Sequence, residues 1–229
     1  TFEYAKVSGG LFFDMSIHDF DMARYLSGSE AEEISAFGAV MINPQLEEIG
    51  DIDAATIMIR MKNGVLCIID NVRKSGYGYD LRSEVECENG CVQSGNDNPT
   101  TTIISTMDGV VSDIPKWFFL ERFEEAFRDE MISFVDDIRN DRIPQIGLQD
   151  GLASVLIATA AKKSVEESRI VNINELYKAN ICFLFFCHKY SSFFSYIKSA
   201  FCFLFDKQII NFLYFLKLLM FPIHFHELQ

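Results

Sequence analysis

Histidine is scarce in this sequence. Residues 1 to 179 contain a single histidine, His18, and the other three histidines lie between residues 180 and 229. Histidine is the side chain whose unperturbed titration falls closest to neutral pH, so a proton transfer carried out by residues 1 to 179 has one natural candidate. The scarcity of histidine therefore directs attention to His18.

Basic side chains are also few. Residues 1 to 179 hold 16 basic and 31 acidic side chains, which gives this part of the chain a net charge of −15. Because no basic run is long enough to neutralise a series of phosphates, we expect this part to repel nucleic acids and anionic lipid surfaces. Nucleic-acid binding is excluded on this ground, and a membrane partner is disfavoured.

Cysteine offers neither a disulfide framework nor a metal cluster. Cys67, Cys87 and Cys91 are the only cysteines before residue 180, an odd number without metal-ligand spacing. The sequence does not open on the apolar segment of a secretory signal. We therefore expect no metal site and a reducing, cytoplasmic compartment.

Two common catalytic motifs are missing as well. The sequence contains no Gly-x-Ser-x-Gly turn, which carries the nucleophile of many serine hydrolases, and no Walker phosphate-binding loop. Serine hydrolysis and nucleotide-dependent phosphoryl transfer therefore find no support.

A short helix is predicted around His18. After the Gly9-Gly10 pair, Ser16 and Asp19 resemble a capping box, and apolar residues recur at helical spacing up to Gly28. The pattern predicts an amphipathic helix with His18 in its first turn.

Alternating apolar residues then predict a series of strands. The expected segments are residues 33–41, 54–61, 65–72, 79–88, 101–106 and 110–111. The pairs Asn63-Gly64, Asn89-Gly90 and Asp108-Gly109 supply hairpin turns between them. Consecutive hairpins favour an antiparallel sheet over βαβ units.

From Leu120 the apolar period becomes helical, and a second helical pattern runs from Leu152 to Ala160. Residues 169–173 can return as an edge strand. The predicted fold class is therefore α+β, with a mostly antiparallel open sheet covered by helices on one face.

Residues 180 to 229 differ in composition from the rest. They contain no glycine, one proline and 15 aromatic residues. A transmembrane span needs about 20 predominantly apolar residues, and charged residues interrupt the tract, although residues 209–225 come closest. We treat residues 1–179 as one domain and residues 180–229 as a separate Phe-rich tail, interpreted either as a gene-model artefact or as a membrane-associated segment.

Asp14 and His18 form the most suggestive pair. Their separation of four residues places both side chains on one side of the turn that enters the helix. A carboxylate there can fix the imidazole tautomer by a hydrogen bond and leave the other nitrogen free to take a proton from a substrate hydroxyl. Spacing alone leaves a second interpretation open, in which Asp14 caps the helix and His18 is a surface or core residue.

The segment from Ser8 to Arg24, SGGLFFDMSIHDFDMAR, resembles the start of the substrate domain of inositol 2-dehydrogenases, members of the Gfo/Idh/MocA oxidoreductase family. The similarity covers about residues 1–175. Its further motifs are residues 50–53, 69–73, 76–82, 118–123 and 150–151. The resemblance implies the C-terminal substrate and oligomerisation domain of that family.

Three residues receive roles by this resemblance. His18 corresponds to the general base that removes a hydroxyl proton while hydride leaves the same carbon for NAD, and Asp14 to the residue that orients the polyol and the imidazole. Tyr77 corresponds to a residue lining the inositol site, although an aromatic cover on the sheet is an equal alternative. The resemblance also implies an inositol-like polyol as substrate and a homo-oligomer formed through the sheet.

The sequence departs from the family in two respects. The family's dinucleotide-binding Rossmann half is not found, and neither is the family's Glu-Lys-Pro motif. Ser8-Gly9-Gly10 and Gly76-x-Gly78 lack the βαβ setting of a dinucleotide-binding fingerprint. We therefore expect no cofactor-binding residues and an inactive chain in isolation. The alternative is a non-catalytic polyol-binding or oligomerisation module derived from the same family.

Overall fold

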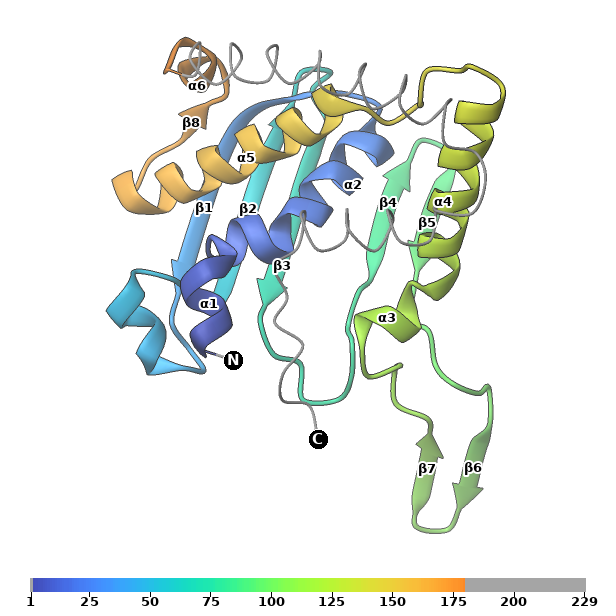
Figure 1. Cartoon of the computed structure of the whole chain (residues 1–229). Coiled ribbons are helices and arrows are strands. Elements are labelled where there is room, and N and C mark those ends of the chain that lie inside the picture. Colours follow the sequence, from blue (N-terminus) through green and yellow to red (C-terminus); the bar gives the residue numbers. More distant parts are fainter. Residues whose placement is uncertain (1, 180–229) are drawn as a thin grey trace. The chain divides into compact units, whose positions relative to one another are not determined.

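The computed structural model describes residues 2 to 179, and Figure 1 labels their α-helices and strands. The fold begins with three consecutive helical segments, of which the third contains His18. They are α1 (Phe2–Ser8), the π-helix η1 (Phe12–Ser16) and α2 (Ile17–Ser27). Gly10, between α1 and η1, has φ +91°, a conformation that side chains with a Cβ rarely adopt.

The predicted capping box at Ser16 and Asp19 is wrong, whereas the predicted stop at Gly28 is confirmed. Ser16 has helical dihedral angles and makes no side-chain cap. Because η1 runs directly into α2, the backbone carbonyls of η1 are available to the first amides of α2, and no side-chain cap is needed there. Gly28 ends α2 in the left-handed conformation, with φ 59°.

A four-stranded antiparallel sheet forms the centre of the fold, in the order β3-β2-β1-β8. Its strands are β1 (Ala31–Ala39), β2 (Ala54–Met61), β3 (Leu66–Val72) and β8 (Val171–Asn172). The 3-10 helix η2 (Pro44–Ile49) lies between β1 and β2 in the sequence. The α+β class with an antiparallel sheet is therefore confirmed.

The later hairpins are separate from this sheet. β4 pairs only with β5, and β6 only with β7, across the turns predicted at Asn89-Gly90 and Asp108-Gly109. Their bounds are β4 (Ser83–Cys87), β5 (Gly90–Ser94), β6 (Ile103–Thr106) and β7 (Gly109–Ser112). The hairpins were predictable from their turns, but their separation from the main sheet was not.

Helices α2 and α5 (Leu148–Glu167) lie across one face of the four-stranded sheet (Figure 1). Buried alanines and serines on α5 allow close approach to the sheet. The Ser164 hydroxyl accepts the Ala36 amide at 2.9 Å and donates to the Arg169 carbonyl at 2.6 Å. Where the two-residue strand β8 no longer covers β1, a side chain of α5 thus satisfies the strand edge.

Arg24 joins α2 to the start of α5. Its guanidinium donates to Asp21 at 2.8 Å, to Glu30 at 2.7 Å and to Asp150 at 3.2 Å. The Arg24 side chain is largely buried, so these charge-assisted bonds fix α2, and with it His18, against the start of α5.

The long helix predicted from Leu120 is present but interrupted. It forms α3 (Phe119–Arg122) and α4 (Glu124–Arg139), separated at Phe123. Within residues 2–179, no residue of α4 is fully buried, and Phe127 and Phe134 remain 44% and 45% exposed. Periodicity predicted the helix correctly but could not show whether its apolar side would be covered.

The chain divides into two units, Thr1–Leu176 and Tyr177–Gln229. The last helix in the described part is α6 (Asn174–Ala179). No helix in residues 2–179 has both the length and the apolar composition needed to cross a membrane. The predicted tail, residues 180–229, lies outside the described residues.

Candidate active site

Polar side chains collect where the end of β3 meets the helix layer. The half-buried positions of β3 are Cys67, Ile69 and Asn71, and Ile69 and Asn71 pair with the buried Ile57 and Ala55 of β2. This row therefore faces the core and changes from apolar to polar towards the end of the strand. Arg73 follows in the same alternation.

Arg73 holds Asp14, one of the predicted site residues. The Arg73 Nη1 donates to Asp14 Oδ2 at 2.8 Å, and Nη2 donates to Asp51 Oδ2 at 2.9 Å. Tyr4 donates its hydroxyl to the other oxygen, Asp14 Oδ1, at 2.6 Å. Asp14 therefore belongs to a network that joins α1, η1, the loop before β2 and the end of β3.

This network raises the pKa of the Tyr4 phenol. The hydrogen bond to Asp14, burial and the negative charge of Asp14 raise the pKa of Tyr4 to about 12, although the Arg73 charge acts in the opposite direction. The Tyr4 phenol is therefore a stable hydrogen-bond donor to Asp14 at physiological pH.

His18 lies in the first turn of α2 with an exposed side chain. Within residues 2–179 it makes no hydrogen bond or ion pair with another side chain. The predicted hydrogen bond from the His18 imidazole to Asp14 does not form; the Asp14 oxygens instead accept from Tyr4 and Arg73. In the described part of the chain, no residue hydrogen-bonds either imidazole nitrogen of His18.

Asp19, next to His18, connects this turn to β3. Its carboxylate accepts the Asn71 amide at 2.8 Å. Burial raises the pKa of Asp19, while the Asn71 hydrogen bond and the His18 charge oppose the shift. The Asn71 contact holds the first turn of α2 beside the polar end of β3 and so fixes the place of His18.

Tyr77 lies in the loop after β3 and is 49% exposed. Its hydroxyl donates to Asp80, which also accepts from Arg82 at 2.8 Å and from Asn96 at 2.7 Å. Arg82 above all, with Tyr77 and Asn96, outweighs desolvation and lowers the pKa of Asp80 to about 2. This ionised carboxylate orients the Tyr77 ring, and the structure records no contact from Tyr77 to Asp14 or His18.

Sequence reasoning missed four residues that hold the site together: Arg73, Asp51, Asn71 and Tyr4. A signal existed for Asn71 and Arg73, because both are polar residues in the row of β3 that otherwise faces the core. Asp51 and Tyr4 carry no comparable pattern, since only folding brings them to Arg73 and Asp14.

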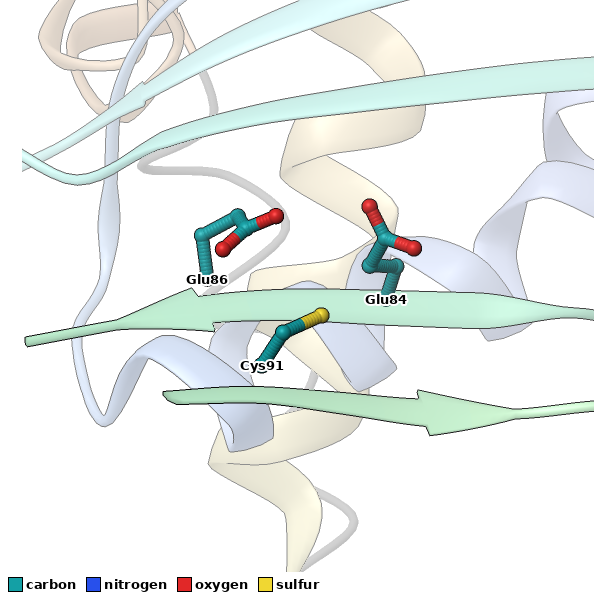
Figure 2. Close-up of side chains that lie close together, drawn as sticks. All are labelled: Glu84, Glu86 and Cys91. Atoms are coloured by element: carbon teal, nitrogen blue, oxygen red, sulfur yellow. The ribbon is translucent and has the colours of Figure 1, made fainter. Parts of the chain in front are cut away.

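A second cluster lies on the β4–β5 hairpin. Figure 2 shows the carboxylates of Glu84 and Glu86 close to the thiol of Cys91, and all three residues are exposed. Desolvation, the Glu84 charge and a hydrogen bond to Glu86 raise the pKa of Cys91. Exposed acidic groups often lie close together in proteins that bind no metal there, so this cluster by itself does not identify a metal centre.

Comparison with known proteins places this geometry in a family. Residues 1–93 match the GFO/IDH/MocA C-terminal domain. An uncharacterized oxidoreductase of Bacillus subtilis, YrbE, is 45% identical over 177 residues, which cover 77% of this chain and 52% of the relative. Myo-inositol 2-dehydrogenase of Thermotoga maritima is 40% identical over 174 residues, which cover 76% of this chain and 52% of the relative.

A solved structure shares the fold. The scyllo-inositol dehydrogenase from Lactobacillus casei, with bound NAD(H) and scyllo-inositol, matches with a TM-score of 0.70 and 27% identity, covering 76% of this chain and 52% of that chain. The present chain spans about half the length of the curated relatives it matches. From the sequence match and the shared fold, the chain belongs to the GFO/IDH/MocA family and carries its C-terminal domain.

Proposed function

We propose that this chain is the substrate-binding and catalytic half of an NAD-dependent inositol 2-dehydrogenase-like oxidoreductase, which oxidises a polyol hydroxyl to a ketone. One observation carries the proposal: the exposed His18 imidazole makes no protein hydrogen bond within residues 2–179 and stands one turn from the fixed carboxylate of Asp14. The inositol dehydrogenases among the relatives supply the substrate class.

The chain's own residues account for substrate binding and proton removal. Asp14 accepts polyol hydroxyls, and the neutral His18 imidazole accepts the proton of the hydroxyl whose carbon loses hydride. Tyr77, held by Asp80, lines the polyol site from the loop after β3. Each of these three roles is part of the proposal.

Residues 2–179 do not fit a dinucleotide. The sheet they form is antiparallel throughout and provides no βαβ unit. At Gly10 an added Cβ would lie 2.9 Å from Asp51 Oδ1, so a pyrophosphate approaching this turn would meet a carboxylate. The proposal therefore assigns NAD to protein outside residues 2–179.

We also propose that the protein is cytoplasmic. Cys67, Cys87 and Cys91 are free thiols in the described part of the chain. Free thiols persist in reducing compartments, which supports this location.

A chimera tests the function. Joined to the dinucleotide-binding half of the Thermotoga maritima relative, the chain should reduce NAD when inositol is added, as followed by absorbance. The unfused chain is the control and should show no saturable NAD binding below about millimolar, a scale of about −4 kcal/mol. A folded chimera that binds NAD and inositol without oxidising inositol would instead support the non-catalytic polyol-binding module.

The open face of the sheet supports a homo-oligomer. Opposite the helix layer, Phe37, Met58 and Ile68 are 79%, 51% and 71% exposed, and Met58 pairs directly with Ile68 across β2 and β3. An apolar surface of this kind on a sheet is typical of subunit contacts. We propose that two copies pack through it.

Charged substitutions on this face should produce monomers. Met58→Glu combined with Ile68→Glu places like charges together in the proposed contact, and light scattering after size exclusion should report half the native mass or less. Val7→Glu, at an apolar position 80% exposed on α1, is the matched control and should keep the native mass. A monomeric native chain, or an unchanged mass in the double variant, would contradict the proposal.

A further inference from the structure

Arg73 bridges two carboxylates that come from separate segments. Its two terminal nitrogens donate to Asp14 at 2.8 Å and to Asp51 at 2.9 Å. The side chains of Arg73, Asp14 and Asp51 are only 16%, 14% and 8% exposed. Charge-assisted hydrogen bonds so sheltered from water are stronger than exposed ion pairs.

The bridge is itself anchored to the backbone. Asp51 Oδ1 accepts the Leu11 amide at 2.9 Å, and the Arg73 amide donates to the Asp53 carbonyl at 2.8 Å. The start of η1, the loop before β2 and the end of β3 are therefore held in one arrangement. A shift of Arg73 would disturb all three segments.

The Asp14 carboxylate retains free acceptor capacity. A carboxylate offers about four acceptor positions, and Tyr4 and Arg73 occupy two of those of Asp14. Because each oxygen is held by one protein donor, the carboxylate cannot rotate freely. Its remaining positions are therefore fixed in direction.

We infer that Arg73 is a positioning residue for polyol recognition: it fixes the Asp14 carboxylate so that its remaining acceptor positions receive two polyol hydroxyls. The inference rests on the proposed function of Asp14 in substrate binding. It requires arginine in particular, because a lysine ammonium lacks the planar pair of donors that reaches two carboxylates at once.

Polyol binding to the full chain tests this role. Scyllo-inositol is titrated while NMR follows the imidazole resonances of His18, assigned by their loss in His18→Gln. Arg73→Met should weaken binding about 10-fold or more, as expected for loss of a hydrogen bond to a charged group. Arg73→Lys should recover only part of the affinity, and Asp51→Asn, which keeps both Arg73 and Asp14, should show an intermediate loss.

Arg128→Met is the matched control. Arg128, on α4, pairs with Asp129 at 3.2 Å, and its side chain is 63% exposed. This variant should bind scyllo-inositol within about twofold of the native chain, since exposed ion pairs contribute little. Circular dichroism establishes that each variant is folded, and Asp51→Asn decides the question if Arg73→Met does not fold.

The outcomes separate the inference from the proposed function. A native chain that does not bind scyllo-inositol would contradict the proposed function and the inference together. Native affinity in folded Arg73→Met, or in Asp51→Asn, would overturn the inference alone. Full affinity in Arg73→Lys would show that charge suffices and would overturn the requirement for the two-armed guanidinium.

Discussion

Replacing His18 by glutamine in the chimera should lower kcat for inositol oxidation by about 100-fold or more, the usual contribution of a positioned general base. Glutamine still forms a hydrogen bond to a hydroxyl but cannot take its proton, so KM should change much less than kcat. Asp14→Asn should share part of the loss, because a neutral amide is a weaker acceptor of polyol hydroxyls than the carboxylate. Steady-state kinetics with both variants gives these values.

The pH profile identifies the group that is lost. Native oxidation should slow on the acidic side, where imidazole is protonated and cannot act as a base, and this acidic limb should be absent from His18→Gln. Tyr25→Phe, at an 80% exposed position of the same helix, is the control and should keep native kinetics. Native rates with an intact limb in His18→Gln would assign the base to another residue.

Replacing Asp53 by alanine should cost about 3 kcal/mol or more of the free energy of unfolding. Asp53 is 1% exposed, and its carboxylate accepts the amides of Met41, Ile42 and Asn43 at 2.6, 2.9 and 2.7 Å. Its removal takes the charged acceptor from all three amides, and a hydrogen bond to a charged group contributes about 1.5–3 kcal/mol. Urea unfolding at neutral pH measures the loss.

The stabilising effect of Asp53 should disappear in acid. Burial opposes its ionisation, but the three amides outweigh burial and lower its pKa below the unfolded value. The ionised group therefore stabilises the fold above the unfolded pKa, about 3.9, and this contribution is lost as pH falls through the lower folded pKa. Asp53→Asn should flatten this part of the stability profile, whereas Asp108→Asn, at an exposed hairpin turn, should not.

Local sequence signals predicted the elements that depend on local chemistry. Gly28 ends α2, Asn63-Gly64 joins β2 to β3, and the edge strand expected within residues 169–173 forms as β8. These features follow from the backbone freedom of glycine and from alternation along a strand. The π-helix η1 escaped prediction because its apolar pattern does not distinguish it from the start of an α-helix.

The candidate site was predictable only in part, because it joins residues that are far apart in the sequence. Asp14 and His18 share one short segment, so their spacing drew attention to them. Arg73 lies 59 residues from Asp14 and 22 from Asp51, and no local pattern pairs residues so far apart. Tertiary structure alone assigns Asp14 to Arg73 instead of His18, which changes Asp14 from a partner of the imidazole to an independently fixed acceptor.

The π-helix η1 sets the angle around the helix axis between Asp14 and His18, the two residues proposed to bind the polyol. A π turn contains one residue more than an α turn, and segments of this kind are frequent at functional sites. Each residue of an α-helix advances the chain by about 100° around its axis. Loss of one residue between Asp14 and His18 would therefore swing the carboxylate, together with Tyr4 and α1, around the axis and away from the imidazole. The length of this segment is thus a stricter constraint on the site than the identity of the intervening side chains.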